Sequence, residues 1–210
     1  MTTPMREKMI AQVAKQREDI RKMDPQKIAG NTGMKFENSL FYVDFYGEPY
    51  TISFPDLEVR FVKTNKVCGL NRSAMFFFYM LTADGSPSTG RWVAFRDLPG
   101  GTFYHQAYQG YSGDRLAKAI DNHTHVFERA AKQWNGDKLD IGNAAFAFQA
   151  LPRVRVAAVY NEGDEDFPAT ANVLFDASAS NYLPTDALGG VGSALVDRLT
   201  GVESKDDQED

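Results

Sequence analysis

The stretch Ala144-Ala-Phe-Ala-Phe-Gln-Ala-Leu-Pro-Arg-Val-Arg-Val-Ala-Ala-Val-Tyr160 decides the fold class. Phenylalanines alternate with alanines in its first half, and apolar residues alternate again in its second half. A period of two is typical of a strand with one face on the core, and a proline between two such runs marks a turn. The sequence therefore predicts two strands, over 144–150 and 154–160, joined at Leu151-Pro152.

A second group of short strands is predicted upstream of this hairpin. After the turn cluster Gly30–Gly33, aromatic and β-branched residues fill Leu40–Phe45, Tyr50–Phe54 and Glu58–Val62, and Phe36 precedes them. Turn residues separate these runs, so we expect an antiparallel meander of three or four strands. Single strands are also expected at Arg91–Phe95 and Asn172–Phe175, completing a mostly antiparallel sheet.

Helices are predicted before, between and after these strands along the chain. Leu70–Ala83 is too apolar to be exposed, so we expect a buried helix in which Phe76 and Phe77 are buried alike. Thr102–Trp134 should form two or three helices, an N-terminal helix should stop at Asp24-Pro25, and a last helix should end near Leu199. The predicted fold is α+β, a single domain over 1–202 whose sheet is covered by helices.

Composition narrows the class of protein. The chain has 210 residues, 23 Lys and Arg against 28 Asp and Glu, and a net charge of −5. This acidic balance argues against nucleic-acid binding, which needs a basic surface. The single cysteine, Cys68, excludes a disulfide framework, and no apolar run or leader-like segment indicates a membrane or secreted protein, so we expect the cytoplasm. Residues 203–210 carry five acids and should form a disordered tail that contributes nothing to folding.

Three groups of polar residues are candidates for chemistry. Arg96 and His105 flank the turn Leu98-Pro-Gly-Gly101, and Asp176 ends a predicted strand, so we expect all three to line one cleft. The two histidines of His123-x-His125 share a face on a strand but not on a helix. Because the pattern around them is helical, the rings should diverge, and no metal site is predicted. The acidic run Glu162–Asp166 is expected to be a solvated hairpin turn.

Five stretches together resemble the family called domain of unknown function 3786. They are Leu81-Thr-Ala-Asp-Gly85, Trp92-Val-Ala-Phe-Arg-Asp-Leu-Pro-Gly-Gly-Thr-Phe-Tyr-His105, Phe148-Gln-Ala-Leu-Pro-Arg153, Gly163-Asp-Glu-Asp-Phe-Pro168 and Phe175-Asp-Ala-Ser-Ala-Ser-Asn-Tyr-Leu-Pro184. The resemblance extends from about Met9 to Leu199. It implies a protein of anaerobic bacteria or archaea, and some members carry an added iron–sulfur domain of the type seen with corrinoid proteins. With one cysteine, this chain would need a partner to supply such a cluster.

Three functions stay open on these grounds. The first is an accessory protein that binds a small molecule or cofactor, for example a corrinoid or another tetrapyrrole. Aromatic side chains would stack on the ligand and arginines would pair with its carboxylates, and the candidates are Trp92, Arg96, Tyr104, His105, Gln149, Arg153 and Asp176. The second is an enzyme, for example a hydrolase, in which His105 works with Asp176 or Glu162 as acid–base groups. The third is a protein-interaction module.

Overall fold

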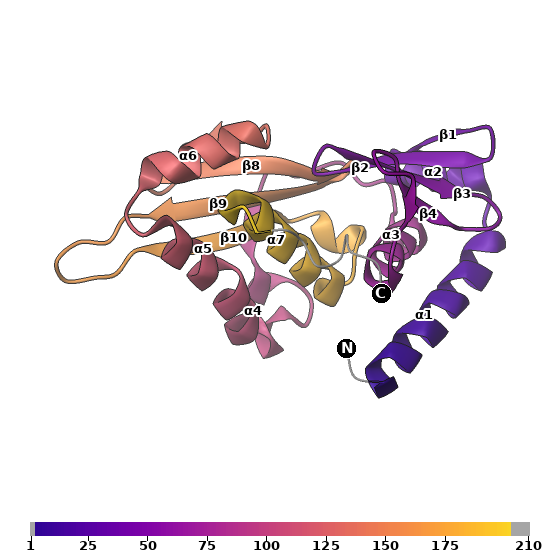
Figure 1. Ribbon diagram of the computed structural model, residues 1–210, viewed down its shortest axis with the longest axis horizontal. Coiled ribbons are helices and arrows are strands. Elements are labelled where there is room, and N and C mark those ends of the chain that lie inside the picture. The colour runs from indigo at the N-terminus through magenta and orange to yellow at the C-terminus, as the bar shows by residue number, and fades with distance from the viewer. Residues whose placement is uncertain (1–2, 203–210) are drawn as a thin grey trace.

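The computed structural model describes residues 3–202, so the predicted acidic tail lies outside the described residues. The fold is α+β, with two five-stranded antiparallel sheets that lie at opposite ends of the long axis (Figure 1). We expected one sheet, and the structure corrects this to two. One hydrophobic cluster nevertheless extends through both sheets, from Phe41 in the first to Phe175 in the second. This shared core supports the single-domain prediction.

The first sheet is the predicted meander, with one strand more than expected. Its strands pair in the order β1-β2-β3-β4-β5, each antiparallel to the next. Every second residue of β2 is buried on the core side, which explains the period of two; these residues are Phe41, Val43 and Phe45. The bounds are β1 Lys35–Glu37, β2 Leu40–Phe45, β3 Glu48–Ser53, β4 Val59–Phe61 and β5 Lys66–Val67.

The second sheet contains the hairpin predicted over residues 144–160. β8 and β9 pair as predicted, with Phe146 opposite Ala158 and Phe148 opposite Val156. β10 adds to β9, and the strand at residue 92 adds to β10, giving the order β6-β10-β9-β8-β7. The bounds are β6 Trp92–Ala94, β7 Asp137–Leu139, β8 Ala144–Leu151, β9 Val154–Asn161 and β10 Thr170–Asp176.

The N-terminal helices pack against a third helix beside the first sheet. Asp24-Pro25 ends α1 (Thr3–Arg21) as predicted, but it also starts an unexpected helix, α2 (Pro25–Thr32), because the Asp24 carboxylate caps the amide of Gln26 and proline fits a first turn. α1 packs on α3 (Leu70–Thr82), where Phe76 and Phe77 are both fully buried, as predicted. Among the described residues, no helix has the length and apolarity needed to cross a bilayer.

Four later helices lie on the core face of the second sheet (Figure 1). Thr102–Trp134 was expected to hold two or three helices, and it holds three. Phe127 of α6 packs on Phe146 and Tyr160, and Tyr108 of α4 packs on Phe175, which shows how aromatic side chains join helices to strands. The bounds are α4 His105–Tyr111, α5 Gly113–Ile120, α6 Thr124–Gln133 and α7 Thr185–Thr200.

Glycines on α7 make room for the tyrosines of α4. A Cβ atom at Gly192 would lie 2.1 Å from the hydroxyl of Tyr108, and one at Gly189 would lie 3.0 Å from the hydroxyl of Tyr111. The Tyr108 ring cannot retreat easily, because it stacks on Phe95 with 4.1 Å between ring centroids. The glycines therefore lower the helix propensity of α7 but allow it to pack closely, within the sequence Leu188-Gly-Gly-Val-Gly192.

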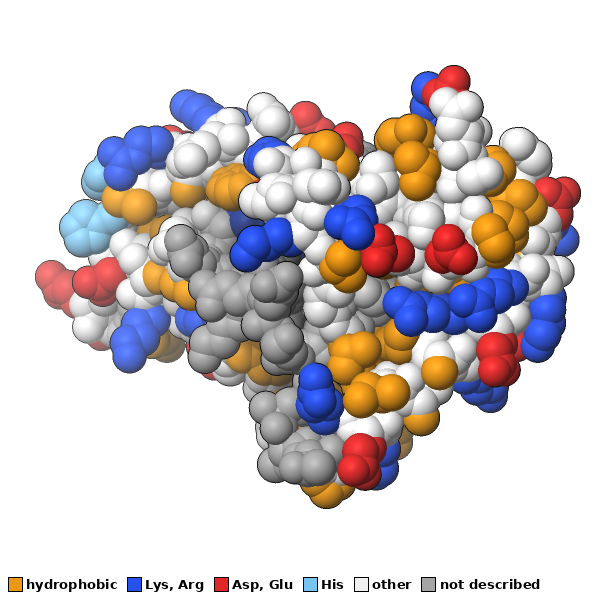
Figure 2. Space-filling view, turned by 45° about the vertical axis from the view of Figure 1, so that its right-hand side comes forward, with side chains coloured by type: hydrophobic (Ala, Val, Ile, Leu, Met, Phe, Trp, Pro, Cys, Tyr) orange, Lys and Arg blue, Asp and Glu red, His pale blue; other side chains and the backbone are white. Residues whose placement is uncertain are grey.

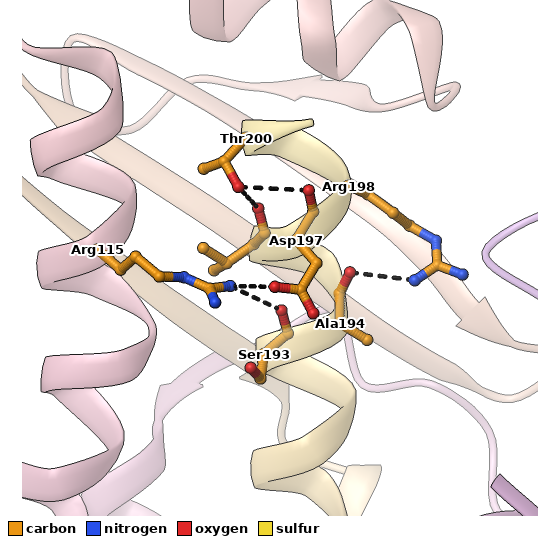
Figure 3. Close-up of polar contacts among 7 residues, drawn as sticks. Arg115, Ser193, Ala194, Asp197, Arg198 and Thr200 are labelled. Carbon is orange, nitrogen blue, oxygen red and sulfur yellow. Dashed lines mark hydrogen bonds and ion pairs between the residues drawn. The ribbon is translucent and has the colours of Figure 1, made fainter. Parts of the chain in front are cut away.

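Arg198 of α7 connects the two sheets. Its side chain is 5% exposed and forms an ion pair with Glu48 of β3, and its guanidinium lies 5.1 Å from the Phe45 ring centroid and 5.2 Å from that of Trp134. One residue earlier, Asp197 accepts a 2.6 Å hydrogen bond from Arg115 of α5 (Figure 3). Figure 3 shows these two arginines on opposite sides of α7, one held by the second sheet's helices and one pointing toward the first sheet.

We expect Gly192→Ala to destabilise the protein by about 1–3 kcal/mol, because the new methyl group overpacks the contact with Tyr108. Thermal or urea unfolding of the purified variant measures this. Gly190→Ala is the matched control, since nothing lies within 4 Å of its Cβ position. It should leave stability unchanged or raise it by up to about 1 kcal/mol, as alanine favours a helix. Equal effects of the two variants would contradict the packing argument.

Arg198→Met should cost about 3–5 kcal/mol, because it removes a guanidinium that is only 5% exposed, together with its ion pair to Glu48 and its contacts with the Phe45 and Trp134 rings. Lys63, 3.8 Å from the Glu48 carboxylate, stays as a more exposed ion-pair partner. Arg115→Met removes an ion pair from the same helix, but that arginine side chain is 36% exposed, so the loss should be about 1 kcal/mol or less. Urea denaturation of both variants tests whether Arg198→Met loses more stability than Arg115→Met. A smaller loss for Arg198→Met than for Arg115→Met would show that the buried pair does not hold the sheets together.

Candidate functional site

The turn between β6 and α4 brings Arg96 and His105 to one place, as the sequence suggested. Two short 3₁₀ helices, Phe95–Asp97 and Gly101–Phe103, fold the chain back on itself. The hydroxyl of Thr102 donates to the carbonyl of Arg96 at 3.1 Å. A Cβ atom at Gly101 would lie 1.9 Å from the carbonyl oxygen of Phe95, so only glycine permits this close approach. The glycine at the second position of the Gly-Gly pair is thus required by the backbone geometry of the turn.

Arg96 and His105 line a pocket of about 240 Å³ at the edge of the second sheet. Its walls come from the end of β6, from α4 and from β10, beyond the point where β6 stops pairing with it. Apolar surface from Phe95 and Val173 lies beside the polar groups. The lining residues are Ala94, Phe95, Arg96, His105, Tyr108, Gln109, Asn172 and Val173.

The tautomer of His105 follows from its hydrogen bond. Nδ1 lies 2.7 Å from the carbonyl oxygen of Thr102, and a carbonyl only accepts, so Nδ1 carries the proton. In the neutral ring, Nε2 is then an acceptor, and in the charged ring it is a donor. Arg96 supplies a cation whose nearest carboxylate, Asp97, is 3.9 Å away. The pocket can therefore present positive charge and hydrogen-bond donors to a bound anion.

Tyr108 forms the buried wall of this pocket. It is 3% exposed, and its hydroxyl has no hydrogen-bond partner among the described residues. Burial raises the pKa of Tyr108 well above its usual value, and the nearby Tyr46 raises it further. The phenol therefore stays protonated at all ordinary pH values, and the wall carries no negative charge.

Asp176 does not line this pocket, although we expected it there with Arg96 and His105. It is 1% exposed, and its carboxylate accepts six hydrogen bonds, from the backbone and side chains of Ser88, Thr89, Gly90 and Ser178. Burial alone would raise the pKa of Asp176, but these donors outweigh burial and hold it far below its usual value. Asp176 fastens the loop between α3 and β6 to the end of β10.

The other four candidates lie at separate places. Tyr104 precedes α4 and is 69% exposed, outside the pocket lining. Trp92 is on β6, 5.9 Å from the Arg155 guanidinium, and the Arg153 amide donates to the Tyr79 hydroxyl at 3.0 Å. Gln149 lines a different groove, of about 430 Å³, between β2 and β8. The structure thus brings together two of the seven predicted binding residues.

The histidine pair was predicted to diverge, and that prediction is wrong. The rings of His123 and His125 have centroids 5.9 Å apart. α6 begins at Thr124, so His123 sits before the helix, with φ −103° and ψ 62°, and helical spacing does not apply to it. Glu162 lies in the hairpin between β9 and β10, as expected for a turn, and its carboxylate accepts from the Thr124 hydroxyl at 2.5 Å.

Besides Tyr108, two polar residues that line the pocket were not predicted from the sequence. Gln109 donates to the Asp114 carboxylate at 2.8 Å and to the Ala171 carbonyl at 3.0 Å, which ties α4 to the edge of β10. Asn172 faces solvent on the same strand. The signal for Asn172 was its polar position inside an otherwise apolar strand. No local pattern marks Gln109, because its role depends on a strand 62 residues away.

Asp176→Asn should destabilise the protein by at least about 2 kcal/mol. The asparagine side chain has an NH₂ group in place of one carboxylate oxygen, and this group cannot accept the hydrogen bonds that the oxygen accepted. Because the folded pKa of Asp176 is depressed, its stabilising contribution is complete above the unfolded value of about 4 and is lost as the pH falls below it. As the pH is lowered from 5 to about 2, the free energy of unfolding should therefore fall less in the variant than in the natural protein.

Melting temperatures measured across this pH range test the prediction. Asp84→Asn is the control, because the Asp84 carboxylate caps the amide of Ser86 in the same loop but is exposed. It should cost under about 1 kcal/mol. An acid response of Asp176→Asn identical to that of the natural protein would contradict the assignment.

Comparison with known proteins gives a family for this chain. No curated protein and no solved structure matches it. The sequence model of one family, domain of unknown function 3786, matches residues 24–198, which include both sheets and the pocket. This confirms the resemblance drawn from the five sequence stretches. The chain belongs to the domain of unknown function 3786 family.

Proposed function

We propose that the protein binds a small anionic molecule in the pocket beside Arg96 and His105. The observation that supports this most directly is the convergence of these two side chains, which come from opposite ends of the Gly-Gly turn, on one pocket. Arginine recognises carboxylates and phosphates through paired donors, and a histidine of fixed orientation adds a directed hydrogen bond. The buried wall of Phe95 and Tyr108 suits an apolar part of the same ligand.

The size of the pocket limits the ligand. Sites for drug-sized molecules span about 300–1,000 Å³, and this pocket measures about 240 Å³. A short carboxylic acid or a small phosphorylated compound is of suitable size. A carboxylate is the simpler occupant, because one guanidinium and one imidazole can satisfy its two oxygens.

A corrinoid or another tetrapyrrole does not fit these residues. Such a macrocycle is larger than a drug-sized ligand, and both aromatic side chains predicted to stack on it, Trp92 and Tyr104, lie outside the pocket lining. Of the two arginines predicted to pair with its carboxylates, Arg153 also lies outside. Only Arg96 and His105 of the seven predicted residues would face the ring. An accessory role beside a corrinoid or iron–sulfur partner stays a prediction from the family resemblance.

A binding role also suits the pocket better than acid–base catalysis. Its described lining residues include no carboxylate, serine or cysteine. The carboxylates considered as partners of His105 belong to Asp176, which is saturated with donors, and to Glu162, which is bonded to Thr124. We therefore keep the binding function ahead of the hydrolase alternative.

A second candidate function uses the same turn as an interaction surface. Phe103 is 87% exposed and Tyr104 is 69% exposed, directly before the helix that carries His105. Exposed large aromatic side chains are enriched where proteins meet. The protein-interaction alternative is therefore best sought at this turn, and a partner bound there would also cover the pocket.

Binding is tested by titrating the purified protein with succinate and with inorganic phosphate, using calorimetry and the shift in melting temperature. We expect saturable binding of at least one anion. Arg96→Ala and His105→Ala should each weaken it by at least about tenfold, because each removes a charge-assisted hydrogen bond. Arg96 is exposed and His105 is half-buried, with one hydrogen bond to the Thr102 carbonyl, so stability should change little for Arg96→Ala and by about 1 kcal/mol for His105→Ala.

Arg91→Ala is the matched control. Arg91 is an exposed arginine five positions before Arg96 and does not line the pocket. It should bind the anions as the natural protein does. Equal losses in Arg91→Ala and Arg96→Ala would indicate nonspecific attraction to surface charge, and the proposal would then fail. Absence of saturable binding by both anions would overturn it as well.

A further inference from the structure

We propose that His123 and His125 form a binding site for one divalent transition-metal ion of the nickel, copper or zinc class. The site is separate from the anion pocket, because neither histidine lines it. Three observations carry the proposal: the spacing of the two rings, the fixed tautomer of His123, and the acidic hairpin beside them.

The spacing of the rings suits a shared ligand. A metal ion about 2.1 Å from an imidazole nitrogen lies about 3.2 Å from that ring's centroid, so two imidazoles on one ion have centroids at most about 6.4 Å apart. The centroids of His123 and His125 are 5.9 Å apart, with an angle of 75° between the rings. Small rotations of exposed side chains can bring both nitrogens onto one ion without movement of the backbone.

The orientation of His123 is already set by the protein. Its Nδ1 lies 3.2 Å from the carbonyl oxygen of Ile120, and a carbonyl cannot donate, so Nδ1 carries the proton. Nε2 of the neutral ring then has its lone pair available to a metal. Histidines that ligate metals usually donate their other N–H to such an acceptor, which fixes the ring and strengthens the ligand.

Negative charge lies on one side of the pair. The amide of Gly163 donates to the Asn122 side chain at 2.8 Å, and Glu162 accepts from Thr124, so the hairpin after β9 is held against the start of α6. This hairpin exposes Glu162, Asp164, Glu165 and Asp166. Figure 2 shows histidine side chains at the left edge of the molecule with acidic side chains just below them. Such a field favours cations.

The site would have two protein ligands and open positions. No group of three or more His, Cys, Asp or Glu side chains among residues 3–202 is arranged to hold a metal. Water would therefore complete the coordination shell. Imidazole ligands select copper, nickel and zinc over magnesium and calcium, which prefer oxygen.

The test uses the untagged full chain, freed of metal with a chelator and titrated with Zn²⁺, Ni²⁺ and Cu²⁺ by calorimetry. We expect one ion per chain, with His123→Ala and His125→Ala each weakening binding by at least about tenfold. His105→Ala changes the third histidine of the chain and should bind the metals as the natural protein does. The Cu²⁺ complex should show nitrogen coupling from two imidazoles in its electron paramagnetic resonance spectrum.

Two results would overturn the proposal. One is unchanged affinity in the double variant His123→Ala/His125→Ala, which would place the ion at the acidic hairpin alone. The other is the absence of saturable binding by all three metals. Both histidines are exposed, so the variants should keep the natural melting temperature, and a matched circular dichroism spectrum verifies this. The titration with anions is independent, so either proposal can fail without the other.

Discussion

The buried guanidinium of Arg198 is the constraint on which the two-sheet arrangement depends. A charge in a largely buried position is costly unless it is paired and its donors are used. Here Glu48 of the first sheet supplies the opposite charge, and the carbonyl of Ala194 accepts a hydrogen bond at 3.1 Å. The rings of Phe45, Tyr46 and Trp134 lie within 5.2 Å of the cation. These partners come from both halves of the chain, so the cation gains all of them only when the halves meet, although its buried Nε still finds no hydrogen-bond partner among the described residues.

α7 is shaped by the same requirement. It must approach the first sheet closely enough for Arg198 to reach Glu48 while it rests on the helices of the second sheet. Gly192 lets α7 lie close to α4 by leaving space for Tyr108, and from the side of the first sheet the Tyr46 hydroxyl donates to the carbonyl of Val191 at 2.9 Å. Close packing and the ion pair are therefore two consequences of one placement of α7.

The fold class was predictable because its signals are local. Alternation of apolar residues in 40–62 and 144–160 gives strands, and the apolar run after Leu70 gives a buried helix, whatever lies beside them. The division into two sheets was not predictable, since it depends on contacts such as Arg198 with Glu48, 150 residues apart. α2 was missed for a different reason: Asp24-Pro25 was interpreted only as the end of one helix, although the same pair is also a good start for another.

The candidate site shows the same division between local and distant causes. The Gly-Gly turn is local, so the proximity of Arg96 and His105 followed from sequence. The position of His123 depended on where α6 begins, and a shift of one residue decides whether two histidines diverge or converge. Asp176 looked like a functional carboxylate because it ends a strand, but only the folded loop reveals the six donors that occupy it.

Asp176 still influences the pocket, through the strand that leads to Arg96. Trp92 lies opposite Asp176 and Ala94 opposite Leu174, so the register of β6 on β10 determines where Arg96 emerges. This pairing is only three residues long, and so short an edge strand has few hydrogen bonds of its own to hold its register. The carboxylate fixes the loop at Ser88–Gly90, immediately before β6, and thereby limits how far the strand can slip. A buried carboxylate at one end of the pairing thus helps to position a guanidinium beyond the other end, without lining the pocket itself.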